Sequence, residues 1–278
     1  VQVVQLTASA GAQLRGPLQI EQVKAGGDFT AGAQTALGEL AVLAGGTFHL
    51  AGPVGQIQLE EGSSGARLTL CSGSTLVSGP GEAEQVRVSG QADVWVNATV
   101  TQAAVAGDAV GAGLTLDGVA DTVAVEAGGT ARQITLYAPT SLTVAGQVEE
   151  LNVITAEAVR AEGTGSVAAV NASEPSALQL EGGLVQSEPR AVRQELKGLT
   201  IYQPPRKTSY QLGEELDTTG LVVIGQYEVL SGDRVITTCS GQVFPEISGF
   251  DSQTAGSKTL NLTCGGRSIS LPVYVLPQ

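Results

Sequence analysis

Apolar residues recur with one spacing over the first two thirds of the chain. In segments that begin at Phe48, Val94, Leu114 and Leu142, apolar side chains occupy relative positions 0, 2, 9 and 11, and Gly or Ala occupies position 4. Alternation at positions 0 and 2, and again at 9 and 11, is typical of strands with one buried face. The small residue between them allows the backbone to turn. Each copy therefore predicts two short strands joined by a corner.

Weaker copies begin at Leu14, Ala31, Val77 and Ala161, so the pattern returns about every 17 to 20 residues. Two longer intervals hold an additional segment of about 12 residues, and these two insert segments resemble each other. No helical spacing of apolar residues persists before residue 185. Self-similarity at a short fixed period is the mark of a solenoid, in which successive coils stack and continue parallel sheets. We predict about nine coils.

This pattern resembles the right-handed parallel β-helix of bacterial surface and phage proteins, and it covers residues 1–190. Two other kinds of solenoid do not fit the sequence. The left-handed hexapeptide helix requires a six-residue rhythm, and the calcium-binding nonapeptide roll requires Gly-Gly-x-Gly-x-Asp rows; the sequence has neither. The predicted fold class of the first domain is therefore all-β, a right-handed parallel β-helix.

A different pattern begins near residue 197. The polar stretch 187–194 before it is expected to be a linker or a cover over the last coil, because an open end would expose strand edges. Beyond it, short strands alternate with turns, including an apolar strand at 221–226 and a terminal hairpin around Gly265 and Gly266. This arrangement predicts a small β-sandwich over residues 197–278.

The amino-acid sequence of this second domain, over residues 197–277, resembles the bacterial immunoglobulin-like domain of group 3. The motif positions are Tyr210, Gly213, Leu216, Gly220, Leu221 and Val223, followed by Phe250, Asp251, Ser252 and Gly256. Cys264 stands where the family usually has an aromatic or polar residue, and the middle segment is longer than usual. The resemblance implies a spacer or adhesive module of a secreted or wall-attached protein, with no catalytic residues.

Charge narrows the range of partners. The net charge is −13, and residues 1–195 hold 20 acidic against 8 basic side chains. An acidic surface repels nucleic acid and anionic lipid, so neither is an expected partner. No apolar run is long enough for membrane insertion. An export signal or anchor is expected to lie outside this sequence.

The cysteines and acidic residues suggest little chemistry. Cys71, Cys239 and Cys264 form no metal motif, and no cofactor is expected. Cys239 and Cys264 are a candidate disulfide, with two free thiols as the alternative. Aligning the copies in register places acidic residues in two adjacent rows along one predicted corner. The rows hold Glu84, Thr101, Asp121 and Glu149, and Glu39, Gln56, Gln85, Gln102, Thr122 and Glu150. A carboxylate cleft or calcium ladder is one interpretation, and a solvated polar corner is the favoured one.

Two aromatic residues are candidate glycan contacts. Trp95 is expected to point outward from its strand, and Tyr137 follows another predicted strand. Exposed aromatic rings stack on sugar rings, although isolated surface aromatics are the alternative. His49 is the single histidine and is expected at the surface. The sequence has no second histidine that could serve a serine or cysteine nucleophile. No catalytic site is recognised, and the chain is expected not to be an enzyme.

The sequence thus favours a non-catalytic extracellular bacterial protein, secreted or attached to the cell wall, that acts in adhesion or structural display. Its partner would be a host or cell-wall glycan or protein. The alternative is a carbohydrate-binding or carbohydrate-active β-helix, similar to polysaccharide lyases and hydrolases. A third interpretation is a building block of a longer extracellular chain.

Overall fold

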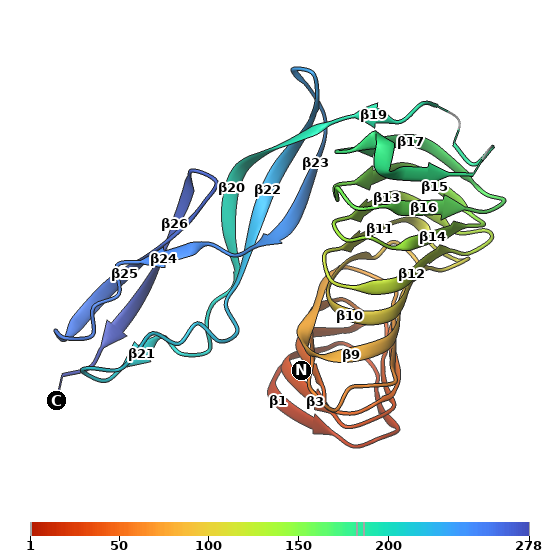
Figure 1. Cartoon of the computed structure of the whole chain (residues 1–278). Coiled ribbons are helices and arrows are strands. Elements are labelled where there is room, and N and C mark those ends of the chain that lie inside the picture. The colour runs from red at the N-terminus through yellow and green to blue at the C-terminus, as the bar shows by residue number, and fades with distance from the viewer. Residues whose placement is uncertain (1, 182, 186, 278) are drawn as a thin grey trace. The chain divides into compact units, whose positions relative to one another are not determined.

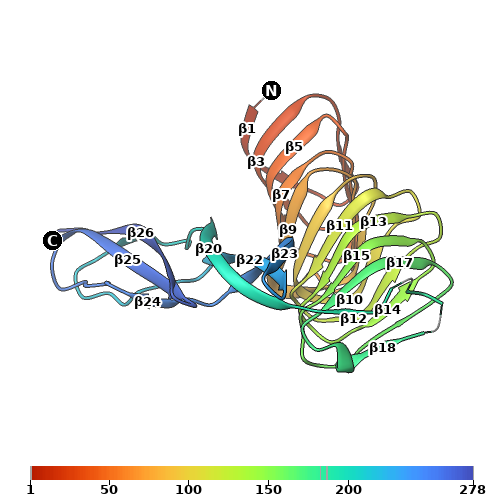
Figure 2. The same ribbon diagram turned by 90° about the horizontal axis from the view of Figure 1, so that it is seen from above.

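The computed structural model describes residues 2–181, 183–185 and 187–277, with Thr237 and Cys239 described by their backbone alone. Within these residues the chain is built from strands, and one single-turn helix, η1 (Pro175–Ala177), interrupts them. Two compact units divide the chain between residues 191 and 192. The first is a parallel β-solenoid, whose stacked coils run from red to green in Figures 1 and 2.

The coils of the solenoid place their strands in two parallel stacks. Stack 1 contains β1 (Gln2–Ala8), β3 (Leu18–Ala25), β5 (Thr35–Val42), β7 (Val54–Leu59), β11 (Val110–Leu116), β13 (Thr130–Leu136), β15 (Gln147–Val153), β17 (Ser166–Ala172) and β19 (Arg190–Ala191). Stack 2 contains β2 (Ala12–Leu14), β4 (Phe29–Ala31), β6 (Gly46–Leu50), β8 (Ala66–Leu70), β12 (Ala120–Val125), β14 (Ser141–Val144), β16 (Val159–Glu162) and β18 (Leu178–Leu180). The long strands β9 (Ser74–Val88) and β10 (Asp93–Val105) run through both stacks.

Parallel pairing sets like residues side by side in the core. One inward row of stack 1 shows this, since each of its members pairs in register with the next along the solenoid. The row consists of Val23, Leu40, Ile57, Val77, Val96, Leu116, Leu136 and Val153, and none is more than 2% exposed. Burial of aliphatic surface along such rows is the main stabilising term of a solenoid.

The predicted spacing is confirmed, but its phase changes along the chain. The copy that begins at Phe48 starts in stack 2, on β6, whereas the copy that begins at Val94 starts in stack 1, on β10. The two predicted inserts are ordinary strands, β8 with the start of β9, and β13 with β14. The long intervals are therefore one and a half coils, and the described residues form ten coils rather than nine. The spacing was ambiguous because both halves of a coil carry the same pattern.

Where position 4 is glycine, as at Gly52 and Gly118, close approach of neighbouring coils requires it. A Cβ atom at Gly52 would lie 2.0 Å from the carbonyl oxygen of Thr35, and one at Gly118 would lie 2.1 Å from that of Ala98. Real Cβ atoms do not approach backbone oxygen so closely. The corner can follow the preceding coil at the spacing of the strands only where the side chain is absent.

The last complete coil is covered by a partial coil. β19 pairs with β17, Val185 forms a bridge with Val167, and Leu184 is 1% exposed. Of the two functions expected for residues 187–194, covering the last coil therefore fits residues 190–191. The following residues, from Arg193, already belong to the first strand of the second unit.

The second unit is a sandwich of two sheets, which confirms the immunoglobulin-like fold. One sheet contains β20 (Arg193–Gln203), β22 (Val222–Ser231) and β23 (Arg234–Val243). The other contains β21 (Ser209–Tyr210), β26 (Arg267–Val275), β25 (Gly256–Cys264) and β24 (Glu246–Ser248). Side chains from both sheets, such as Val223 at 1% and Leu260 at 0% exposure, form one core.

The family motif positions have structural roles in this sandwich. The Tyr210 ring is buried and lies edge-on to Phe250, with ring centroids 4.9 Å apart. Its hydroxyl lies 2.9 Å from the carbonyl oxygen of Lys207 and 3.0 Å from that of Asp217, within hydrogen-bonding distance of both. Asp251 accepts hydrogen bonds from the Gln253 amide and the Thr254 hydroxyl, and so fixes the turn before β25. The motif therefore stabilises the fold.

The inward register is testable at Leu116, which is fully buried between Val96 and Leu136. Leu116→Asp should lower the free energy of unfolding by at least about 3 kcal/mol, because it places an unpaired charge in an apolar core. Thr143→Asp, at an exposed position of β14, should cost less than about 0.5 kcal/mol. Denaturant unfolding measures both. Equal stabilities of the two variants would contradict the register.

Candidate functional site

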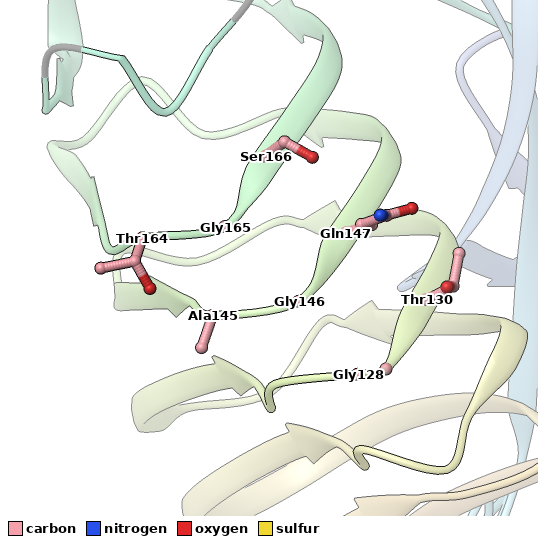
Figure 3. Close-up of a pocket in the computed structure, with 9 residues that line it drawn as sticks. Gly128, Thr130, Ala145, Gly146, Gln147, Thr164, Gly165 and Ser166 are labelled. Carbon is pink, nitrogen blue, oxygen red and sulfur yellow. The ribbon is translucent and has the colours of Figure 1, made fainter.

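A groove lies at the corner where each coil passes from stack 2 to stack 1. Residues 128–130, 145–147 and 164–166, from three successive coils, line a cavity of about 350 Å³. We call these residues the corner groove. Figure 3 shows Thr130, Gln147 and Ser166 projecting from successive coils, with Ala145 and Thr164 on the other side of the glycines. The groove therefore runs across the coils, along the direction in which they stack.

The hollow exists because the corner has no side chains at its base. A Cβ atom at Gly129 would lie 2.2 Å from the carbonyl oxygen of Ala106, and one at Gly165 would lie 2.1 Å from that of Gly146. A Cβ atom at Gly146 would likewise lie 2.3 Å from the carbonyl oxygen of Gly129. Each glycine is therefore needed for coil stacking, and the absence of three side chains leaves the base of the groove as bare backbone.

The wall of the groove presents uncharged polar groups at the coil spacing. Thr130 pairs in register with Gln147, and Gln147 with Ser166. Their backbone amides are already used, as in the bond of 2.9 Å from Gln147 to the Gly129 carbonyl. Their side chains are partly or fully exposed, and in the described part of the chain they make no hydrogen bond to protein. One hydroxyl or amide per coil, about 4.8 Å apart, is thus available to a ligand.

An ion pair that spans two coils lies beside the groove. Arg87 reaches Glu126 with contacts of 3.0 Å (Nε to Oε1) and 2.6 Å (Nη2 to Oε2), and it crosses Ala104, which is 1% exposed. The Gly107 amide also donates to Glu126, at 2.9 Å. The hydrogen bonds from Arg87, and then that from Gly107, lower the pKa of the Glu126 carboxyl. Glu126 is thus a fixed, ionised carboxylate and unsuited to act as a general acid.

A second pair repeats this design. Arg132 reaches Asp93 at 2.7 Å across two coils, and the coil between them carries Gly113 at that point. A Cβ atom at Gly113 would lie 2.1 Å from Oδ1 of Asp93. In both pairs a small residue in the middle coil allows the arginine to cross it. These pairs were not predicted from the sequence, although opposite charges 39 residues apart with Ala or Gly between them were a usable signal.

The corner of the earlier coils carries a polar cluster. Ser89 is buried and donates to Asp108 at 2.8 Å, while the Asp108 side chain is exposed. Burial raises the pKa of the Cys71 thiol, so this cysteine is a poor nucleophile at neutral pH. Asp108 precedes the groove by one coil, and among the carboxylates of this corner it is less constrained than Glu126. It is the residue here that could act as a base toward a bound ligand.

The predicted glycan contacts lie elsewhere, on the outer side of stack 1. Trp95 is half-buried and pairs with Leu76 and Thr115, while its neighbours Val94 and Val96 are inward and buried. Tyr137 comes directly after β13 and is also half-buried. The two residues are two coils apart, roughly 10 Å along the stack. The structure places both aromatics on one side of the solenoid but brings neither into the corner groove.

The predicted acidic rows along a single corner are wrong. Glu39 and Gln56 lie in stack 1, whereas Gln85, Gln102 and Thr122 follow one another in stack 2. Glu149 and Glu150 are again in stack 1, on β15. The rows divide because the repeat changes phase by half a coil. His49 is exposed on β6 in register with Thr30 and Thr69, which agrees with a surface residue.

Taken together, the two units define a β-solenoid protein with an appended sandwich. Residues 203–275 match the family model described as bacterial Ig-like domain (group 3). The second unit is therefore a bacterial immunoglobulin-like domain of group 3. Its first strand, β20, lies almost entirely before the matched residues. The described residues contain no helix with the length and apolar character needed to cross a bilayer.

Two individual proteins show similarity. A segment of 80 residues is 35% identical to pectate lyase L from Thermoclostridium stercorarium, and it spans 29% of this chain and 6% of that protein. A likeness in structure is found with chitinase ChiW from Paenibacillus sp. str. FPU-7, a cell-surface-expressed multi-modular enzyme. It has 12% identity and a TM-score of 0.27, and covers 99% of this chain and 24% of the chitinase. A TM-score this low supports no conclusion about function.

The expectation that the chain is not an enzyme is contradicted by the similarity to pectate lyase L. That expectation rested on the single histidine and on the absence of a recognised catalytic site. The spacing of residues in the sequence did not show that arginines and carboxylates far apart along the chain meet at the corner of the coils, as Arg87 and Glu126 do.

The contribution of the Arg87–Glu126 pair to the free energy of unfolding should depend on pH. The pKa of Glu126 is lower in the folded than in the unfolded chain, so its contribution is present above the unfolded value, about 4.3, and is lost as pH falls through the folded value. Because the pair is partly solvated, Glu126→Gln should cost about 0.5–1 kcal/mol at pH 7. Urea unfolding of parent and variant should show this difference shrinking below about pH 4. The control is Glu149→Gln, at an exposed side chain. A difference unchanged in acid would contradict the role of the charge.

The candidate disulfide stays a prediction. Cys264 lies on β25, and the side chain of Cys239, on β23 of the other sheet, lies outside the described residues. If the bond forms, alkylation without reductant should modify Cys71 alone, and intact mass should be lower by two hydrogens. Alkylation of all three cysteines under denaturing conditions would show that the bond is absent.

Proposed function

We propose that this chain is part of an extracellular bacterial protein that acts on or binds carbohydrate, and that its corner groove contacts a polysaccharide. The observation that carries the proposal is the row of Thr130, Gln147 and Ser166, which repeats once per coil along an open groove. Sugar hydroxyl groups are paired donors and acceptors, which hydroxyl and amide side chains match. The partial similarity to a pectate lyase supports the same class of ligand.

The direction of the groove favours a polymer over a single sugar. A cavity of about 350 Å³ that crosses three coils is open along the stack. Successive side chains are about 4.8 Å apart, a distance comparable with the advance of one pyranose ring in an extended chain. A linear glycan laid along the groove would therefore present one sugar to each coil.

The outer side of stack 1 is a second contact surface in this proposal. Trp95 and Tyr137 are partly exposed aromatic residues, and stacking of a sugar on an aromatic ring would add apolar contact that hydroxyl pairing lacks. Because the two residues are about two coils apart, they would contact separate sugars. This surface is the one that the sequence indicated, and it is tested separately from the groove.

The immunoglobulin-like domain supports a location at the cell surface, since domains of this group occur in bacterial surface proteins. Its motif residues, such as Tyr210 and Asp251, are engaged in holding the fold. We assign it the role of a spacer that presents the solenoid. Adhesion to, or display on, a glycan-rich surface is the finer function that this arrangement serves.

Retention by immobilised polysaccharides tests the proposal. The whole chain should be slowed in native gels that contain a polysaccharide it recognises, and a glycan array should extend the panel. Thr130→Ala/Gln147→Ala/Ser166→Ala should weaken retention at least tenfold, because it removes the polar wall. The control Thr30→Ala/Thr69→Ala/Thr143→Ala changes matched outward positions of stack 2 and should leave retention unchanged.

Two further variants separate the surfaces. Trp95→Ala should weaken retention if stack 1 also contacts the glycan, and release of reducing ends by the parent but not by Asp108→Asn would identify cleavage at the corner. Failure of the parent to bind any polysaccharide, with the fold intact by circular dichroism, would overturn the proposal. Equal losses in the groove variant and its stack 2 control would also contradict it.

A further inference from the structure

We propose that the corner groove selects an uncharged linear polysaccharide over an anionic one such as polygalacturonate. This inference rests on the proposed function of the groove and names its substrate class. It is drawn from the charges that surround the groove, and it differs from the ligand that the name pectate lyase would suggest.

In the described part of the chain, the three arginines nearest the groove each form an ion pair with a carboxylate. Arg87 is held by Glu126, with a closest contact of 2.6 Å, and Arg132 by Asp93 at 2.7 Å. Arg160 lies 2.7 Å from Glu162 and 3.6 Å from Glu181. A uronate carboxylate binds best to an arginine that has donors to spare. These arginines would have to break an existing pair first.

The remaining charges at the groove are negative. Glu149 lies two residues beyond Gln147 with an exposed side chain, and Asp108 is exposed one coil before the groove. The excess of 20 acidic over 8 basic residues before position 196 adds a repulsive background. Such a field lowers the local concentration of a polyanion and leaves a neutral chain unaffected.

The groups that do line the groove suit neutral sugars. Thr130, Gln147, Ser166 and Thr164 carry no charge and offer both donors and acceptors, while the base is glycine backbone. Hydroxyl and acetamido substituents can bond to such groups without bringing a charge that must be compensated. Among the residues that the structure describes, no unpaired cation lies at the groove. We infer that the groove selects its ligand by this absence of positive charge as well as by its shape.

Charge placed in the groove is the direct test. In affinity electrophoresis, the parent should be retained by at least one neutral polysaccharide among xylan, glucomannan and glycol chitin. It should be retained at least tenfold less by polygalacturonate, with or without calcium. Gln147→Lys should raise retention by polygalacturonate at least tenfold at low salt, and Gln147→Glu should not. Thr143→Lys adds the same charge on the outer side of stack 2 and should give a much smaller gain.

The outcomes separate the two proposals. Stronger retention of the parent by polygalacturonate than by every neutral polysaccharide would overturn this inference and leave glycan binding intact. An equal gain for Gln147→Lys and Thr143→Lys would show that overall charge, not the groove, sets the preference, and would also overturn it. No retention by either class would overturn glycan binding itself. Because Gln147 is exposed, unchanged melting temperatures are expected for its variants.

Discussion

The stacking of one coil on the next at the spacing of a parallel β-ladder is the constraint on which the solenoid depends. Each residue is placed directly over its counterpart in the preceding coil, so Leu40, Ile57 and Val77 meet in one inward row. The same spacing brings backbone against backbone at corners such as those of Gly52 and Gly118, where glycine is required. Rows and corners therefore have one cause, the short distance between coils.

That distance also organises the surface. A long arginine side chain can reach a carboxylate two coils away, provided that the intervening residue is as small as Ala104 or Gly113. Such pairs link three coils, and they also neutralise the positive charges of the arginines at the corner. The groove then consists of bare glycine backbone and a wall of hydroxyl and amide groups, beside arginines that are already paired.

The chemistry that the corner supports is therefore recognition by hydrogen bonding, repeated once per coil, with the exposed carboxylates of Asp108 and Glu149 near its edge. This is a surface suited to a repeating ligand, because a polymer can satisfy successive coils with successive sugars. The sandwich domain adds a second, independently folded unit whose motif residues hold its own turns. Its role in the proposal is to carry the solenoid at a cell surface.

The local pattern could be predicted from the amino-acid sequence alone: which residues are inward, where strands alternate, where small residues permit corners, and which family the second domain resembles. Those features depend on side chains near in sequence, and copies such as those at Phe48 and Leu142 show them directly. The phase of the coils and the contacts between them depend on how the whole chain folds. Because both halves of a coil have the same spacing of apolar residues, the sequence could not show that the repeat shifts by half a coil. That shift divided the expected acidic rows between the two stacks. Arg87 and Glu126 meet only because the chain makes two turns of the solenoid between them. The groove forms where glycines of successive coils lie next to one another and leave no side chains at its base, and the sequence did not show this alignment.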